Sequence, residues 1–180
     1  MESAVIDLDG QGTLTRWWQR RSDALKQPAL LQIDIANIPA KIDAIRVKYD
    51  LTFIDTPPST HDAIRSLATV ADLVVIPTRA TPDDLDTIGP VLRQFHGLLP
   101  VAFVLTATAG KRSLDAVQAE TLLKPLGVIL GRTTNRAAYY RATATGETGK
   151  EADETAKIEI GGIYRKLSKD FPKTPDRLDP

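Results

Sequence analysis

Short runs of branched apolar residues recur along this chain and constrain its fold more than any other feature. The runs are rich in Val, Ile and Leu, and they occupy residues 4–7, 30–34, 51–55, 73–77, 101–105 and 128–130. Unbroken apolar runs of this length are typical of strands buried on both faces of a parallel sheet. Amphipathic segments separate them. The pattern predicts an α/β fold with a doubly wound, mostly parallel sheet and helices on both faces.

The segments between the runs carry helix signals. Thr81-Pro82-Asp83-Asp84 predicts a helix start, with a capping threonine, a proline in the first turn and two acids at the positive end of the dipole. We expect Pro90 to kink that helix. A stripe at helical spacing predicts the last helix despite a weakening glycine pair. It consists of Ile160, Ile163, Tyr164, Leu167 and Phe171.

Length and composition limit the classes that remain. The 180 residues, 42% of them hydrophobic, fit one domain, which we expect over residues 1–171 with a flexible tail over 172–180. The 23 basic and 23 acidic side chains balance, so any nucleic-acid contact has to rest on a local patch. The lack of cysteine excludes disulfides and thiolate zinc sites. Without a leader or a long apolar run, we expect a soluble cytoplasmic protein that does not enter a membrane.

Carboxylates stand at the ends of two predicted strands, where ligands of open α/β sheets bind. Asp7 and Asp9 end the first run, and Asp55 ends the third. Three carboxylates at neighbouring strand ends suit a hard cation such as magnesium, held directly or through water. Strand-end aspartates also serve simply to cap the helix or turn that follows, so both interpretations stay open here.

The segments around these aspartates resemble ParA/MinD-type partition ATPases. Residues 5–15 (VIDLDGQGTLT) resemble the first switch of that family, and residues 49–59 (YDLTFIDTPPS) resemble its Walker B strand and second switch. Residues 72–78 and 135–146 fit as well, so the resemblance runs over nearly the whole chain in the right order. It implies a P-loop NTPase-like fold, a role in plasmid or chromosome partitioning, and ATP and magnesium as cofactors.

The resemblance implies roles for the three aspartates. Asp9 corresponds to the residue that orients the attacking water, which makes it the candidate catalytic residue. Asp7 would stand near the magnesium, and Asp55 would hold the metal through water. These roles agree with the chemistry, since phosphoryl transfer depends on placing water in line and on neutralising charge with a metal.

Other positions of the resemblance concern the nucleotide. Gln11 and Gly12 would belong to the mobile switch that senses the terminal phosphate. Thr106 stands where the family often has an asparagine near the base. Gly10 replaces the family's usual proline, a change that loosens the switch.

The main departure from the family is at the front of the chain. The family places a strand, a glycine-rich phosphate loop with its lysines, and a helix before the aspartate pair, whereas this sequence starts at the aspartate strand. No Gly-x-x-x-x-Gly-Lys-Ser/Thr pattern occurs, and residues 110–113 (GKRS) have only its ending. Without that cradle the main source of triphosphate affinity is missing, so we expect no competent ATPase in the chain as given.

Two interpretations follow from this departure. In the first, the protein is ParA-like and its phosphate loop lies in upstream sequence that is not given. In the second, the chain is a nucleotide-independent regulatory or binding module, a pseudo-ATPase that acts on a complete ParA, an adaptor or DNA. The presence or absence of an in-frame phosphate loop just upstream of the Met1 codon distinguishes them.

The missing strand also affects the expected sheet. In the family it lies between the strands that correspond to residues 51–55 and 73–77. One helix joins these two runs, so we expect the gap to close and the strands to pair directly in a flavodoxin-like order. That layout also fits a receiver domain of two-component signalling, in which Asp7 and Asp9 would form the acidic pair and Asp55 would accept the phosphoryl group.

Basic residues late in the chain suggest partners. Since the ParA resemblance implies non-specific DNA binding by nucleotide-bound dimers, a patch of Arg and Lys becomes a candidate DNA contact. Its residues are Arg132, Arg136, Arg141 and Lys150. A solvated basic face balanced by nearby acids is the alternative. A ParB-like adaptor, a complete ParA and a second copy of this chain are the protein partners that the resemblance implies.

Overall fold

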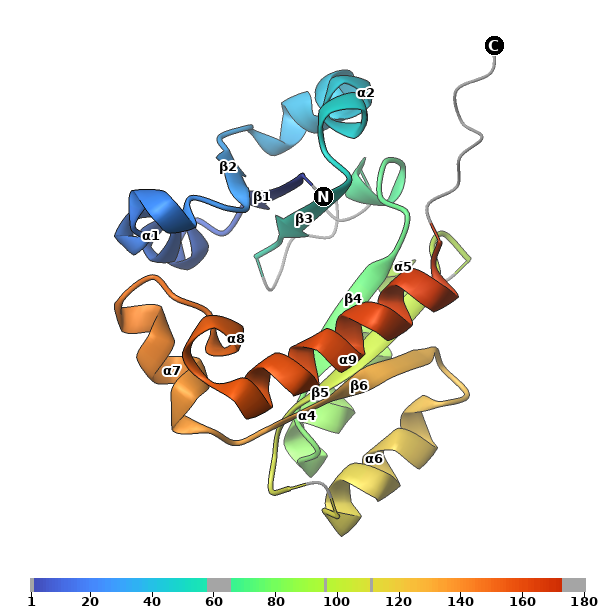
Figure 1. The fold of residues 1–180 in the computed structure, drawn as a ribbon. Coiled ribbons are helices and arrows are strands. Elements are labelled where there is room, and N and C mark those ends of the chain that lie inside the picture. The colour runs from blue at the N-terminus through green and yellow to red at the C-terminus, as the bar shows by residue number, and fades with distance from the viewer. Residues whose placement is uncertain (1, 58–65, 96, 111, 173–180) are drawn as a thin grey trace. The chain divides into compact units, whose positions relative to one another are not determined.

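Strands and helices alternate along the chain as predicted (Figure 1). The structure, a computed structural model, describes residues 2–57, 66–95, 97–110 and 112–172. The strands are β1 (Ser3–Asp7), β2 (Ala29–Leu31), β3 (Leu51–Asp55), β4 (Val74–Thr78), β5 (Val101–Thr108) and β6 (Val128–Thr134). The helices are α1 (Thr13–Arg20), α2 (Ile38–Lys48), α4 (Pro82–Asp86), α5 (Ile88–Phe95), α6 (Leu114–Leu123), α7 (Ala137–Ala144), α8 (Gly149–Ala152) and α9 (Glu154–Asp170), with 3₁₀ turns at Asp23–Leu25 and Ile35–Asn37.

The strands form two parallel sheets in two compact units. The first unit comprises Met1–Asp72, Gly89–Leu99 and Tyr140–Thr148, and the second comprises Leu73–Ile88, Pro100–Tyr139 and Gly149–Pro180. The first unit holds the sheet β2-β1-β3, and the second holds β4-β5-β6. Every ladder is parallel, which confirms the predicted parallel α/β class.

The expected pairing of residues 51–55 with residues 73–77 is wrong. Within the described parts of the chain, β3 pairs only with β1 and β4 pairs only with β5. The backbone of β4 gives a physical reason. The Val74 N–H donates to the Pro100 carbonyl at 3.0 Å, so the alternation of the strand turns Val75 and Pro77 away from β5. Because Pro77 has no N–H, a ladder on that side lacks a donor. The receiver interpretation, which relied on the closed gap, loses its support.

The core of the first unit lies between its sheet and α2. Ile6 of β1 is fully buried and packs with Ile38 and Ile45, which lie two turns apart on α2. Leu67 and Val70 complete this buried cluster. Burying such a side chain contributes about 1.5–3 kcal/mol each, so this apolar face fixes the orientation of β1 and β3.

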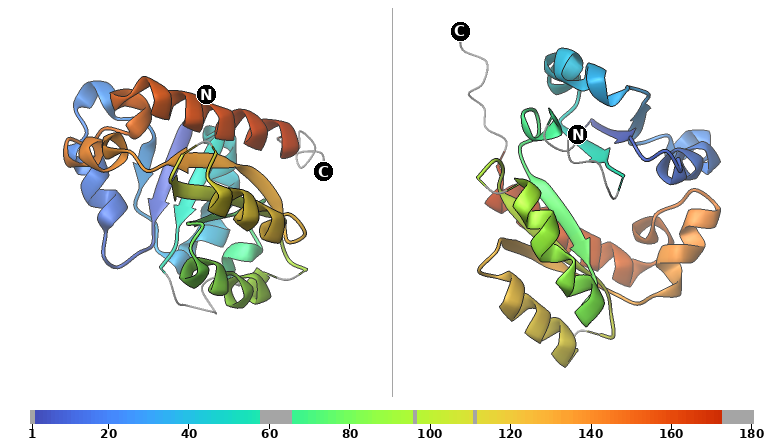
Figure 2. Two further views of the ribbon diagram at one scale, coloured as in Figure 1. Left: turned by 90° about the horizontal axis from the view of Figure 1, so that it is seen from below. Right: turned by 180° about the vertical axis from the view of Figure 1, so that it is seen from behind.

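Helices cover both faces of the sheet in the second unit. Figures 1 and 2 show α9 on one face of β4-β5-β6 and α4 on the other. Phe103 and Leu105 of β5 are fully buried between these layers. The approach of α9 is close at Gly131, because a Cβ there would lie 2.8 Å from Ile163 Cγ1. Among the described helices, none is long and apolar enough to cross a membrane.

The predicted helix start at Thr81 is confirmed, since its side chain accepts a hydrogen bond from the Asp84 N–H. The expected kink is displaced. The helix breaks at Thr87, between α4 and α5, and Pro90 lies in the first turn of α5, where proline is tolerated. Residues 58–59 of the second-switch segment, Lys111 and residues 173–180 of the expected tail lie outside the described residues.

Candidate functional site

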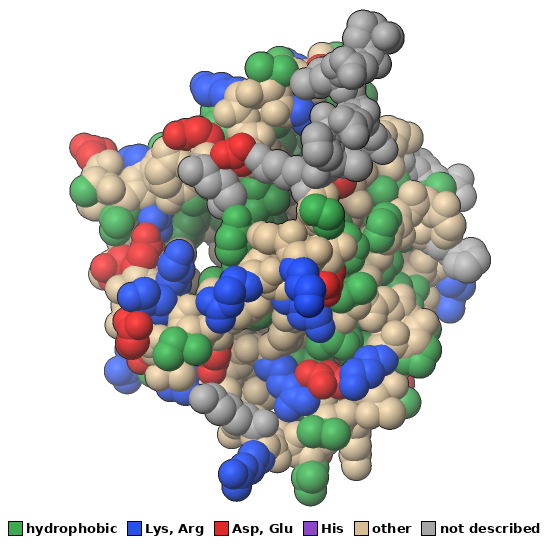
Figure 3. All heavy atoms as spheres, turned by 45° about the vertical axis from the view of Figure 1, so that its right-hand side comes forward, with side chains coloured by type: hydrophobic (Ala, Val, Ile, Leu, Met, Phe, Trp, Pro, Cys, Tyr) green, Lys and Arg blue, Asp and Glu red, His purple; other side chains and the backbone are tan. Residues whose placement is uncertain are grey.

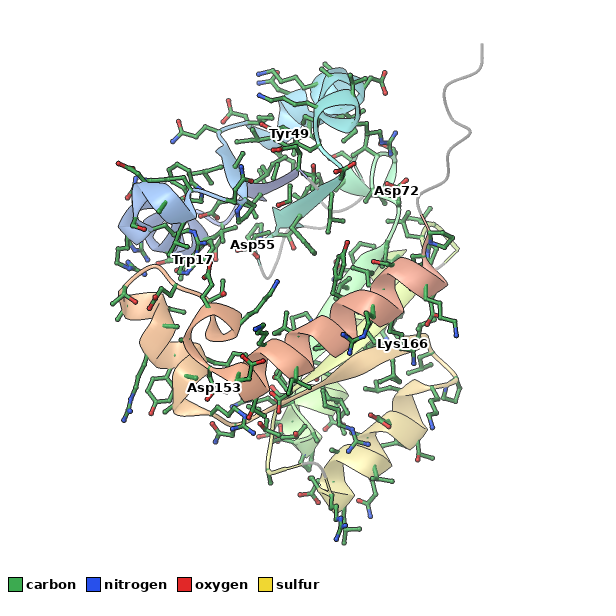
Figure 4. The ribbon with its side chains drawn as sticks, in the orientation of Figure 1. Trp17, Tyr49, Asp55, Asp72, Asp153 and Lys166 are labelled. Atoms are coloured by element: carbon green, nitrogen blue, oxygen red, sulfur yellow. The ribbon has the colours of Figure 1, made fainter. Side chains whose placement is uncertain are left out.

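The three aspartates meet at the carboxyl ends of β1 and β3, in the first unit. Asp7 and Asp55 are register partners in the β1–β3 ladder, and the Asp9 N–H donates to Asp7 Oδ1 at 3.1 Å. Figure 4 shows Asp55 at the end of β3. None of the ion pairs found among the described residues involves these side chains. We call Asp7, Asp9 and Asp55 the acidic cluster.

Asp7 fastens the first turn of α1 to the end of β1. Its Oδ2 accepts hydrogen bonds from both the N–H and the hydroxyl of Thr15, each at 2.8 Å, while Oδ1 accepts the bond from Asp9. Gly12, which precedes the helix, offers no side-chain cap, so Asp7 takes that part from a distance. The capping interpretation of a strand-end aspartate therefore applies to Asp7. Sequence reasoning assigned no role to Thr15. Its only signal is that it is the last residue of the segment 5–15 and carries a hydroxyl group.

The segment between Asp9 and α1 is a tight turn. The Gly12 N–H donates to the Asp9 carbonyl at 2.8 Å, and the Gln11 N–H donates to Asp9 Oδ1 at 2.9 Å. Gly12 has a φ of 62°, in the left-handed region that favours glycine. The Arg16 guanidinium donates to the Gln11 carbonyl. The turn fixes the backbone of Gln11 and leaves this residue exposed.

Charge accumulates in the acidic cluster. Partial burial of the Asp55 carboxyl group, and then the charges of Asp7 and Asp9, raise the pKa of Asp55, against a hydrogen bond from the Thr56 backbone that lowers it. In residues 2–57, 66–95, 97–110 and 112–172, no three His, Cys, Asp or Glu side chains lie close enough to hold a metal ion. Magnesium commonly takes only one or two carboxylates together with water, and Asp55 fits that requirement better than Asp7, whose oxygens are occupied.

Asp55→Asn is expected to stabilise the chain at neutral pH. Because the folded-state pKa of Asp55 is raised, its charge opposes folding above that pKa, and stability increases as pH falls towards 3.8. The residue is exposed, so screening keeps the effect small, a rise in Tm of about 1–3 °C at pH 7. Thermal unfolding in EDTA at pH 7 and pH 4 measures it. The gain should vanish at pH 4, and a lower Tm at pH 7 would contradict this reading of the cluster.

Thr106 lies in the second unit, near the carboxyl end of β5. Its hydroxyl donates to the Thr78 carbonyl at 3.3 Å, which links the ends of β4 and β5. The ladder to β6 is irregular there, and Ala107 adopts a φ of 52°, rare for a residue other than glycine. The hydroxyl of Thr106 is thus at a strand end, in a different unit from the acidic cluster.

The basic candidates are only partly free. Arg132 pairs with Glu120 at 2.5 Å, and this contact raises the pKa of Arg132 and lowers that of Glu120. Arg136 lies 3.6 Å from Glu159. Lys150 on α8 and Arg141 on α7 are both exposed. Lys150 belongs to the second unit and Arg141 to the first. Figure 3 shows basic side chains interspersed with acidic ones on the face that it presents.

Glu159 organises a polar cluster that the sequence did not reveal. Its side chain is 8% exposed and accepts hydrogen bonds from the Thr134 N–H at 3.1 Å, the Thr134 hydroxyl at 2.8 Å and the Tyr139 hydroxyl at 2.8 Å. Burial alone would raise the pKa of Glu159, but these bonds and the Arg136 charge lower it further than burial raises it. Burial, and then Glu159, raise the pKa of Tyr139. The cluster fastens the end of β6 and the start of α7 to α9.

Glu159→Gln is expected to lower stability by about 1–3 kcal/mol at pH 7, because it removes a hydrogen-bonded charge that is almost completely buried. Because folding lowers the pKa of Glu159, its charged form stabilises the folded state at pH values above about 4.5, the pKa of an unperturbed glutamate. This stabilisation is lost as the pH falls through the folded-state pKa. The variant should therefore lose less stability than the parent between pH 5 and pH 3. Urea unfolding at both values measures this, and Glu154→Gln, at an exposed site on the same helix, is the control.

In the first unit, Arg21 connects α1 to residues 140–148. Its guanidinium is buried, donates to the Gly146 carbonyl at 2.6 Å and to the Leu25 carbonyl at 2.5 Å, and lies 4.8 Å from the centre of the Trp17 ring. Trp17, labelled in Figure 4, donates to the Glu147 carbonyl at 3.0 Å. We call these contacts the α1 clamp. The indole N–H of Trp17 thus has a partner, as is usual for a tryptophan that is partly buried.

Known proteins resemble the chain in structure. No protein-family model and no curated protein sequence matches it. A plasmid partition protein of Borrelia burgdorferi bound to AMPPNP superposes with a TM-score of 0.66 at 18% identity, covering 94% of this chain and 87% of that one. MinD of Pyrococcus horikoshii with Mg-ADP gives 0.65 at 15%, covering 96% and 84%. The MinC:MinD complex of Aquifex aeolicus gives 0.71 at 18%, covering 93% and 83%. The chain has the P-loop NTPase-like α/β fold of ParA/MinD ATPases.

Proposed function

We propose that this chain is a ParA-like protein of plasmid or chromosome partitioning that retains the switch and Walker B segments and does not by itself hydrolyse ATP. The observation that carries the proposal is the acidic cluster at the carboxyl ends of β1 and β3, within a fold shared with partition ATPases. Asp9 is the candidate for orienting water. Gln11, on the exposed turn after it, and Gly12 are the candidates for sensing a phosphate.

Nucleotide and metal enter this proposal through the neighbours, which hold AMPPNP or Mg-ADP. In this chain Asp55 would hold magnesium through water, and Asp7 would act by holding Thr15 and the start of α1. Thr106 is the candidate for a contact with the base. The metal would neutralise phosphate charge when bound. The residues for a triphosphate do not fit, because the sequence offers no glycine-rich loop with its lysine.

A regulatory or binding module is the second candidate, favoured by that same lack of a phosphate-loop pattern. Such a pseudo-ATPase would act on a complete ParA, a ParB-like adaptor, a second copy of the chain or DNA. The solved MinC:MinD complex supports partner binding for proteins of this fold. For DNA, Lys150 and Arg141 are better candidates than Arg132 and Arg136, whose charges are already compensated by glutamates.

Titration of the full chain with Mg-ATP in a calorimeter tests the proposal. We expect no saturable heat up to about 1 mM, because a phosphate cradle supplies most triphosphate affinity. Saturable binding at micromolar concentration would overturn it. A filter-binding titration with duplex DNA across salt concentrations tests whether the chain binds DNA. Retention that depends on Lys150 and Arg141 should fall as the salt concentration rises, and it should be lost in a K150E/R141E variant.

A further inference from the structure

Helix α6 of the second unit is apolar on two sides. Its inner side packs on β5 and β6 through small and apolar residues that are 0–2% exposed, namely Ala116, Ala119 and Leu123. Three further apolar residues form what we call the α6 outer face. They are Leu114, Val117 and Leu122, which are 76%, 48% and 62% exposed. Because a helix that is apolar on both sides is usually buried on both sides, this face is expected to have a partner.

The polar groups of the α6 outer face can be covered without losing hydrogen bonds. The Thr121 hydroxyl donates to the Val117 carbonyl at 2.9 Å, so its bond is made within the helix and a partner would not leave this donor unpaired. Gln118 is exposed between Leu114 and Leu122. Its side-chain amide carries both donors and an acceptor, so an identical amide opposite can satisfy it.

The ends of α6 carry opposite charges. Asp115 lies in the first turn and Lys124 caps the carboxyl end, and both are exposed. Two copies of α6 that pair antiparallel bring the Asp115 end of each beside the Lys124 end of the other and oppose the helix dipoles, whereas a parallel pair joins like charges. Gln118 is midway between Leu114 and Leu122 in the sequence, so the two-fold axis of the antiparallel pair passes next to it in both copies.

A membrane or a nucleic acid fits this face less well. Between Leu114 and Leu123 the helix has two acids, Asp115 and Glu120, and no basic residue. A helix that lies on an anionic lipid surface needs Lys and Arg around its apolar side, and a helix on nucleic acid needs them against the phosphates. The charges of α6 therefore favour another α6 over either of these surfaces.

We infer that two copies of this chain pair through the α6 outer face, antiparallel about a two-fold axis next to Gln118. One helix face from each copy makes a small contact, so the dimer is weak, with a dissociation constant on the order of 0.1 mM. The pairing goes beyond the proposed function, because it uses a helix that carries none of the candidate nucleotide residues and does not depend on ATP.

Sedimentation equilibrium of the full chain without nucleotide, from about 10 µM to 1 mM, tests the pairing. We expect the apparent mass to rise with concentration from that of one chain towards that of two. Leu122→Glu should weaken association at least about tenfold, a difference of about 1.4 kcal/mol. The control Val47→Glu, at a position 76% exposed on α2 of the first unit, should leave association unchanged. A parent that stays monomeric at 1 mM, or a Leu122→Glu variant that associates like the parent, would overturn the inference.

A charge exchange at Gln118 tests the two-fold arrangement. Gln118→Glu and Gln118→Lys each place two like charges beside the axis, so each variant alone should associate at least about tenfold more weakly than the parent. An equimolar mixture should recover the association, because each pair then joins opposite charges. A mixture as weak as the single variants, or single variants that associate like the parent, would contradict the inferred pair. Since these measurements contain no nucleotide, their failure is distinguishable from failure of the proposed function.

Discussion

Gly146→Ala is expected to destabilise the first unit by about 3 kcal/mol or more. Gly146 has a φ of 75°, and a Cβ there would lie 2.4 Å from the Arg21 nitrogen and 2.5 Å from the Arg20 carbonyl carbon. Both are backbone atoms at the end of α1, so a rotamer change cannot relieve the overlap. The left-handed conformation adds about 1 kcal/mol for any residue with a Cβ, and overpacking adds about 1–3 kcal/mol. Urea unfolding followed by circular dichroism measures the loss.

Gly97→Ala is the matched control for this variant. Gly97 has nearly the same φ, 73°, and belongs to the same unit. No atom of the described residues lies within 4 Å of the position that its Cβ would take. It should lose only about 1 kcal/mol. The difference between the two variants isolates the contact of Gly146 with the α1 clamp, and equal losses would show that this close approach does not stabilise the unit.

Asp9→Asn is expected to lower ATP hydrolysis about 100-fold in a fusion that adds a strand, a phosphate loop and a helix before Met1. A group that orients or activates the attacking water contributes on the order of 10²–10⁴ to the rate. An amide keeps the size of the side chain and its hydrogen bond to the Gln11 N–H but removes the charge. The loss should appear in kcat with KM nearly unchanged.

Asp83→Asn is the control for this charge change. Asp83 is exposed in the first turn of α4, outside the acidic cluster, and its variant should keep the full rate. A kcat for Asp9→Asn within about twofold of the parent would remove Asp9 from the catalytic role.

Local patterns predicted the strands and helices well. The unbroken apolar runs predicted all six described strands, because branched apolar side chains favour an extended backbone. The Thr81 cap could also be predicted, because every group involved lies within four residues of the sequence. Asp7, Asp9 and Asp55 were brought together by the register of one ladder, which follows from the rule that parallel strands end at the same sheet edge.

Features that depend on distant contacts were not predicted. The separate sheets follow from which strands find partners, and a helical connection between 51–55 and 73–77 is compatible with several pairings. Glu159 on α9 reads as an ordinary exposed helix glutamate until Thr134 and Tyr139 lie against it. Arg21 likewise resembles its neighbour Arg20 in sequence, and only the approach of Gly146 distinguishes the buried guanidinium from an exposed one.

The rate of ATP hydrolysis with magnesium tests whether this chain supplies the switch and Walker B half of a partition ATPase. It is measured on the chain alone and on a fusion that adds a strand, a Gly-x-x-x-x-Gly-Lys-Thr loop and a helix before Met1. We expect no turnover above background for the chain alone. For the fusion we expect magnesium-dependent turnover that Asp9→Asn lowers. A folded fusion that neither binds nor hydrolyses ATP, or a chain that hydrolyses ATP without the added loop, would contradict it.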